Sequence, residues 1–98
     1  MLNLKLSPQA ILDLEDIFEF TYSNWNLKQA EKYQDDFYEH FMMIIQNPEV
    51  GGKYEYKPGG YRKLNCNKHL IFYKIVESSC VIVRILHEQV DLTLKLDD

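Results

Sequence analysis

Cysteines and long apolar runs are both scarce in this sequence of 98 residues. An extended strand between Cys66 and Cys80 would hold the two thiols about 20 Å or more apart, which is too far for a disulfide. No apolar run approaches the roughly 20 residues of a membrane-spanning helix. The N-terminus has neither the basic stretch nor the small-residue cleavage site of a secretory signal. These absences predict a single cytoplasmic domain, residues 1–98, that needs no covalent cross-link.

The motifs of common enzyme and metal sites are also missing. The sequence has no glycine motif that could cradle a phosphate, no zinc-ligand spacing, and no Ser, His and Asp order suited to nucleophilic catalysis. The three histidines, His40, His69 and His87, are spread along the chain and offer no ligand cluster. We therefore expect neither a metal nor another cofactor.

Charge is distributed unevenly, although the formal net charge is only −4. Residues 1–49 contain three lysines and nine acidic residues, whereas residues 53–74 contain six basic residues and one glutamate. The cations of this basic block are Lys53, Lys57, Arg62, Lys63, Lys68 and Lys74. They predict either a surface for a polyanion or an acidic peptide, or simply solvated strand and loop lysines, and the sequence leaves both open.

Residues 61–88 predict an antiparallel meander of three strands, Tyr61–Cys66, His69–Val76 and Cys80–His87. These segments are rich in β-branched and aromatic residues, and the connections between them are short. Strict alternation in the third strand would place Val81, Val83, Ile85 and His87 on one face and Cys80, Ile82, Arg84 and Leu86 on the other. Arg84 and His87 are then polar residues on apolar faces, which makes them the first candidates for function.

Two amphipathic helices precede the meander. A short strand, Asn3–Leu6, is followed by Ser7 and Pro8, which predict the start of a helix that runs to about Trp25. Asn26, with Gln29 three residues later, predicts a second helix start. This helix should end at Asn47, because a proline follows.

The nearly absent linker between the helices predicts an antiparallel helical hairpin, packed on one face of a small antiparallel sheet. The fold class is therefore α+β, in the order β-α-α-β-β-β. The predicted core residues are Leu14, Phe18, Phe37, Phe41 and Ile44. A glycine- and proline-rich loop, residues 48–60, joins the hairpin to the meander. Residues 89–98 predict either a frayed tail or a segment that orders on a partner.

Segments along nearly the whole chain resemble the RelE/ParE superfamily of small bacterial toxins, most closely its ParE branch. In order they are LSPQAILDLEDIFEFTYSNW, QAEKYQDDF, NPEVG, GYRKL, HLIFYKI and VRILHEQVD. The resemblance implies a growth-inhibiting toxin of a type II toxin–antitoxin system, neutralised by a cognate antitoxin in a hetero-oligomer. We also expect the antitoxin to place an amphipathic helix in the hydrophobic groove by the helical hairpin and an extended segment near the meander. ParE-like members are considered to poison DNA gyrase, whereas RelE-like members cut mRNA on the ribosome.

Three residues bear on the choice between these mechanisms. Arg62 and Arg84 resemble the two strand arginines of the superfamily, and His87 falls where related nucleases carry a histidine. The residue after His87, however, is Glu88 and not tyrosine. The sequence pI of about 5.3 also opposes strong attraction to RNA. We therefore favour a gyrase inhibitor that does not bind nucleic acid stably by itself.

The alternatives are a RelE-like ribosome-dependent mRNA endonuclease and a weakened toxin that acts only as an antitoxin-binding module. If the chain is an enzyme, its catalytic candidates are Arg62, Arg84 and His87. The predicted target- or antitoxin-binding residues are Lys53, Lys57, Arg62, Lys63, Arg84, His87 and Glu88. For Arg84, a structural ion pair with a carboxylate is an equally good interpretation.

Overall fold

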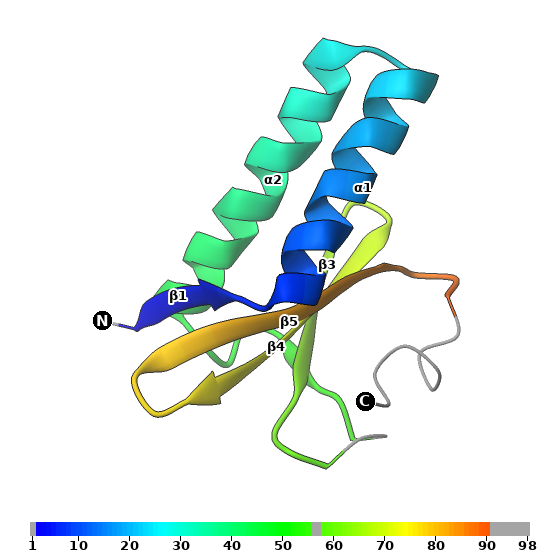
Figure 1. The fold of residues 1–98 in the computed structure, drawn as a ribbon. Coiled ribbons are helices and arrows are strands. Elements are labelled where there is room, and N and C mark those ends of the chain that lie inside the picture. Colours follow the sequence, from blue (N-terminus) through cyan, green and yellow to red (C-terminus); the bar gives the residue numbers. More distant parts are fainter. Residues whose placement is uncertain (1, 56–57, 91–98) are drawn as a thin grey trace.

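The computed structural model describes residues 2–55 and 58–90. Their elements are β1 (Asn3–Leu6), α1 (Pro8–Asn24), α2 (Leu27–Gln46), β2 (Gly52–Lys53), β3 (Arg62–Cys66), β4 (His69–Val76) and β5 (Ser79–His87). Figure 1 shows the two helices as an antiparallel hairpin over one face of the sheet, with the far end of the hairpin projecting beyond it. The predicted α+β fold is confirmed.

The sheet has five strands in the order β1-β5-β4-β3-β2. Strands β3, β4 and β5 form the predicted antiparallel meander. Strand β1 pairs in parallel with β5, so the sheet is mixed and not purely antiparallel. The short strand β2 lies inside the predicted loop and forms the other edge. Pairing between β1 and β5 joins segments separated by most of the chain, and no local pattern specifies its direction.

Both predicted helix starts are present, and one of them also ties the hairpin to the sheet. The Ser7 Oγ accepts a hydrogen bond from the Ala10 amide at 3.0 Å, and the Asn26 Oδ1 accepts one from the Gln29 amide at 2.7 Å. These contacts satisfy amides that a helix leaves without intrahelical partners. The Ser7 hydroxyl also donates to the Val83 carbonyl at 2.7 Å. The start of α1 is thereby fixed beside β5.

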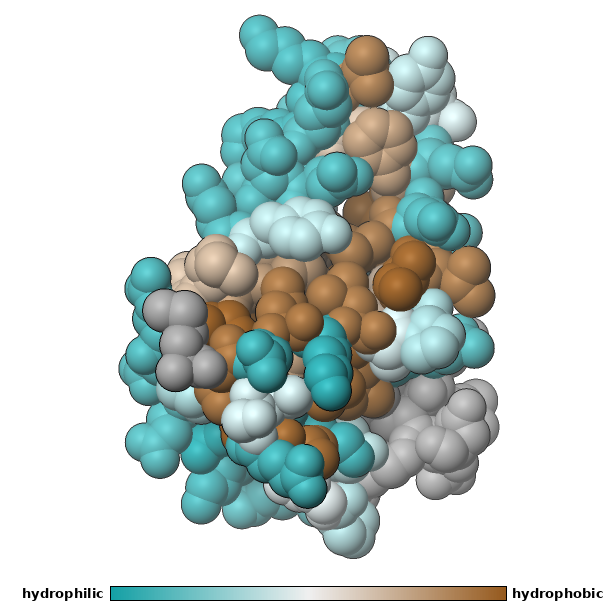
Figure 2. All heavy atoms as spheres, turned by 60° about the vertical axis from the view of Figure 1, so that its left-hand side comes forward, coloured by the Kyte–Doolittle hydropathy of each residue, from teal (hydrophilic) through white to brown (hydrophobic). Residues whose placement is uncertain are grey.

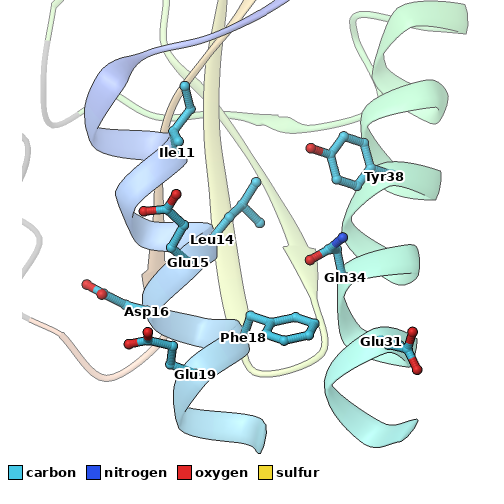
Figure 3. A pocket seen from close by; sticks show the side chains of 9 residues that line it. All are labelled: Ile11, Leu14, Glu15, Asp16, Phe18, Glu19, Glu31, Gln34 and Tyr38. Carbon is cyan, nitrogen blue, oxygen red and sulfur yellow. The ribbon is translucent and has the colours of Figure 1, made fainter. Parts of the chain in front are cut away.

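The main core lies between the hairpin and the sheet. Of the five predicted core residues, Phe37, Phe41 and Ile44 are fully buried there. Leu14 is half-buried and packs against this cluster. The prediction for Phe18 is wrong: it is half-buried, stands outside the cluster and lines a surface groove. The reason is that the preceding residue, Ile17, packs against the cluster, whereas Phe18 is directed toward α2 in the groove between the two helices (Figure 3).

A β-bulge in β5 changes which side chains share a face. Arg84 pairs with Phe72 but Ile82 pairs with Tyr73, so Val83 is the extra residue. Ile85 therefore joins Cys80 and Ile82 in the helix-side cluster. Leu86 belongs to a second cluster on the opposite face, together with Tyr54, Leu70 and Phe72. The strict alternation predicted for this strand is wrong, because one inserted residue shifts its phase.

Candidate functional site

Arg84 is bound to α1 within the fold. Its Nε and Nη2 donate to the Asp13 carboxylate at 2.8 and 2.9 Å. The side chains are only 17% and 12% exposed, so water screens the pair weakly. The Asp13 Oδ2 also accepts the Ile85 amide at 2.9 Å, at the edge of β5 that β1 no longer covers. The structural ion pair that the sequence left open for Arg84 is thus present.

Arg62 is likewise engaged, at the other side of the sheet. Its Nη1 donates to the Gly51 carbonyl at 2.7 Å. The Tyr73 hydroxyl donates to the Pro48 carbonyl at 2.7 Å and accepts the Gly51 amide at 2.9 Å. Burial raises the pKa of Tyr73, which keeps this hydroxyl protonated and able to donate. Arg62 and Tyr73 together hold the loop after α2 against the sheet.

His87 is exposed and stands directly opposite His69 on the neighbouring strand. The two rings meet edge to face, with centroids 5.4 Å apart, and His69 also packs against Phe37 at 5.7 Å. Burial, and secondly the His87 charge, lower the pKa of His69. This pair was not predicted, because only the bulge at Val83 brings the two histidines into register.

The three catalytic candidates do not converge on one point. Arg62 pairs with Tyr73 of the helix-side cluster, whereas Arg84 pairs with Phe72 of the opposite cluster. The guanidinium of Arg62 is held at Gly51 beside β3, and that of Arg84 is held at Asp13 of α1 beside β5, with β4 between the two strands. Two strand spacings separate β3 from β5 by about 10 Å. His87 lies three residues beyond Arg84, about 10 Å along the strand. Within the described residues, no group of three or more His, Cys, Asp or Glu side chains could hold a metal ion.

Cations gather on the face of the sheet that the hairpin leaves uncovered, which we call the basic face. Lys63 pairs with Phe72, while Lys74 and Lys5 both pair with Val81 from opposite sides. The Lys63 Nζ lies 5.9 Å from the centre of the Tyr54 ring, and the Lys74 Nζ lies 4.9 Å from that of Tyr61. Such contacts are typical of cation–π pairs.

The predicted binding residues occupy different parts of this region. Lys53 is exposed on β2, Lys63 belongs to the basic face, and Lys57 lies outside the described residues. Glu88 is exposed, and its amide donates to the Lys68 carbonyl at 3.0 Å. Lys5 was not among the predicted binding residues, because it belongs to the acidic half of the chain. Only the pairing of β1 with β5 brings it to this face.

A groove runs along the solvent side of the helical hairpin (Figure 3). Its floor is apolar, with Leu14 and Phe18 directed from α1 toward α2, and Tyr38 facing them from α2. Its rim is acidic and consists of Glu15, Asp16, Glu19 and Glu31. None of the described lining residues is basic. The groove has a volume of about 790 Å³, enough to take several side chains of a partner.

Further apolar side chains are exposed around the hairpin. At its tip, Phe20 is 67% and Trp25 is 72% exposed. Figure 2 turns the α2 and β1 side toward the viewer and shows apolar side chains gathered where the hairpin meets the sheet. Met42 and Met43 of α2 and Ile75 of β4 are among the large exposed apolar residues. Contiguous apolar surface of this kind is typical of proteins that bind another chain.

The two cysteines are both free and buried. Burial raises the pKa of each thiol to about 11. Neither can act as a reactive thiolate at neutral pH, since the thiol form then dominates. Within the described residues, no helix is long and apolar enough to cross a membrane.

Comparison with known proteins identifies the family. Residues 4–92 match the family model described as the ParE toxin of the type II toxin-antitoxin system parDE. The chain is 35% identical over 92 residues to Toxin ParE1 of Mycobacterium tuberculosis, covering 93% of this chain and 94% of that protein. It is 31% identical over 87 residues to Toxin ParE1 of Caulobacter vibrioides, covering 89% and 90%.

Solved structures agree on the fold. The structure of the chromosomal ParDE toxin–antitoxin system from P. aeruginosa aligns with a TM-score of 0.77 at 21% identity, covering 89% of this chain and 96% of that one. The YoeB–YefM complex from Staphylococcus aureus aligns with a TM-score of 0.61 at 20% identity, covering 89% and 97%. The sequence matches over almost the whole length, together with this shared fold, place the chain in the ParE toxin family of type II toxin–antitoxin systems.

Proposed function

We propose that this toxin arrests growth by inhibiting DNA gyrase in the cytoplasm, and that a cognate antitoxin neutralises it by forming a hetero-oligomer. The observation that carries the proposal is the placement of Arg62 and Arg84. A nuclease needs preorganised cations around one scissile phosphate, because that is where charge develops. Here the two arginines stand on β3 and β5, with β4 between them, and each is bonded to a different part of the fold.

A toxin that inhibits another protein has different structural requirements from a nuclease. Inhibition of an enzyme by a bound protein requires complementary surface and no catalytic group. The basic face and Lys53 offer charge for an acidic partner surface, and His87 and Glu88 are exposed at the end of β5. We propose Lys53, Lys63, His87 and Glu88 as contacts, whereas Arg62 and Arg84 hold the loop after α2 and the helix α1 in place.

The antitoxin part of the proposal rests on the exposed apolar surface. Trp25, Phe20 and the two methionines of α2 remain exposed in the described chain. A flexible partner segment that folds on binding can cover such separate patches at once. One structural neighbour is the YoeB–YefM complex from Staphylococcus aureus. We infer a comparable complex for this chain.

The gyrase proposal is tested with purified protein and supercoiled plasmid. Active gyrase, ATP and the toxin are incubated together, and cleaved DNA is scored after the protein is denatured. We expect linear DNA only when gyrase and toxin are both present. The double variant Lys53→Gln and Lys63→Gln should need a higher concentration to act. The control variant Lys28→Gln and Lys32→Gln removes the same charge from the hairpin and should behave as the parent chain does.

The alternatives are separated by expressing the chain under tight control in cells. We expect induction of the DNA-damage response and intact mRNA. Rapid arrest of translation with codon-phased transcript cuts and no DNA damage would instead identify a ribosome-dependent endonuclease. Unimpaired growth, together with retained antitoxin binding, would identify a weakened toxin that serves only as a binding module.

A further inference from the structure

The groove along the helical hairpin carries negative charge that the fold itself does not neutralise. Its four rim carboxylates come from both helices: Glu15, Asp16 and Glu19 from α1 and Glu31 from α2. Within the described part of the chain, the ion pairs are Lys32 with Asp36 and Arg84 with Asp13, so none of the four rim residues has such a partner. Clustering like charges around a cleft raises the local concentration of oppositely charged groups.

The floor of the same groove suits an apolar helix face. Ile11 is 46% and Tyr38 is 44% exposed, and Leu14 and Phe18 lie between them (Figure 3). A smaller depression lined by Phe18 and Tyr22 continues the groove toward the hairpin tip. From Ile11 to Tyr22 the groove extends about 16 Å along α1, which is the length of about three helical turns. An amphipathic helix inserts an apolar stripe of this length into such a groove.

We propose that the hairpin groove selects an amphipathic helix whose polar face is basic, and that this helix is a segment of the neutralising antitoxin. This inference rests on the proposed antitoxin partnership and adds the sign of the partner's charge. Lys or Arg side chains flanking the apolar stripe would meet Glu15 and Glu19 on one side and Glu31 on the other. Charges at an interface rim steer the encounter and reject partners of the wrong sign more than they add affinity.

The charge of the groove is opposite to that of the basic face. Lys5, Lys63 and Lys74 lie on the uncovered face of the sheet, whereas the groove lies on the solvent side of the hairpin. The two surfaces therefore cannot select the same segment of a partner. An acidic segment that fits the basic face is repelled by the groove, and a basic helix that fits the groove is repelled by the basic face. The charge pattern thus favours acidic partner segments at the basic face and basic partner segments at the groove.

The test uses two synthetic peptides of about 14 residues, with identical apolar positions at i, i+3, i+4 and i+7. One carries lysines on its polar face and the other carries glutamates. Binding to the full chain is measured by fluorescence anisotropy, and the contact is mapped by NMR shift changes. We expect the basic peptide to bind at Leu14, Phe18 and Tyr38, more weakly as salt rises, and the acidic peptide to bind at least about tenfold more weakly.

A matched pair of variants localises the effect. Glu15→Gln with Glu19→Gln neutralises two rim charges one turn apart on α1, and should weaken the basic peptide several-fold. Asp35→Asn with Glu39→Gln neutralises two exposed charges at the same spacing on α2 that do not line the groove, and should leave binding unchanged. All these side chains are exposed, so melting curves should show that both variants fold.

Equal affinity for the two peptides, or equal weakening by the two variants, would overturn the inference. Absence of binding by the basic peptide would do the same. These outcomes are independent of the gyrase assay. A chain that binds the basic peptide in the groove but leaves gyrase unaffected would refute the proposed target and leave the groove assignment standing.

Discussion

Removing the Asp13 carboxylate tests the contact that joins α1 to β5. The Asp13→Ala variant loses two hydrogen bonds to the Arg84 guanidinium and one to the Ile85 amide. Breaking a fully buried ion pair costs about 3–5 kcal/mol, because it leaves an uncompensated charge. Both side chains here keep a little exposure, 17% for Arg84 and 12% for Asp13, so water can partly solvate the remaining group. We therefore expect a loss of about 2–4 kcal/mol in the free energy of unfolding.

The assay is urea denaturation followed by circular dichroism, with thermal melting as a second measure. For a domain of this size, the expected loss lowers Tm by at least about 8 °C. Asp13→Asn keeps an acceptor for the Ile85 amide but removes the charge, so its loss should be smaller than that of Asp13→Ala. The control is Asp35→Ala, which removes an exposed carboxylate and should change stability by less than about 0.5 kcal/mol.

A double-mutant cycle tests whether Asp13 and Arg84 stabilise the fold through their mutual contact. If Asp13 and Arg84 stabilise the fold through each other, Arg84→Ala in the Asp13→Ala background should cost much less than it costs alone. The prediction is contradicted if Asp13→Ala lowers the free energy of unfolding by under about 1 kcal/mol, or if the losses of the two single variants simply add. Either result would mean that α1 is held on the sheet by apolar packing and not by this carboxylate.

Three further predictions concern other parts of the fold. Gly51→Ala should lose about 1–3 kcal/mol in urea denaturation, because the added Cβ would lie 2.6 Å from the Tyr73 hydroxyl oxygen, whereas Gly52→Ala meets nothing within 4 Å and should be nearly neutral. Burial lowers the pKa of His69 below its ordinary value, so the unfolded chain binds more protons than the native chain near pH 6. The free energy of unfolding should therefore fall as pH drops below about 6.5. The variant His69→Phe should flatten this pH dependence. The thiols of Cys66 and Cys80, with pKa values raised to about 11, should resist a thiol reagent at pH 8 in the native protein and react quickly in urea; fast labelling of the native chain would contradict their burial.

Local features of the sequence by themselves determined both helices, the strands of the meander and most of the predicted core. The helix starts at Ser7 and Asn26 rest on contacts within three residues, and the structure contains both. The apolar spacing of α2 predicted the burial of Phe37 and Phe41, because a helix repeats its faces every few residues whatever it packs against. Short connections likewise imposed the antiparallel meander.

Contacts between distant residues were decided only by the tertiary structure. The inserted residue Val83 shifts the register of β5, which separates Arg84 from Ile82 and brings His87 opposite His69. Apolar residues occur on both faces of this strand, so hydrophobic alternation cannot reveal a shift of phase. The partner of Arg84 was equally hidden, because Asp13 lies 71 positions away in the sequence.

The basic face and the hairpin groove also depend on contacts between distant parts of the chain. Lys5 belongs to an acidic half of the chain by composition, and yet the parallel pairing of β1 places it on the basic face. Glu15 and Glu31 read in the sequence as ordinary solvated residues of two separate helices, and only the hairpin sets them on opposite rims of one apolar groove. Sequence patterns record what each segment must bury, whereas the sign of a surface depends on which segments the fold brings side by side.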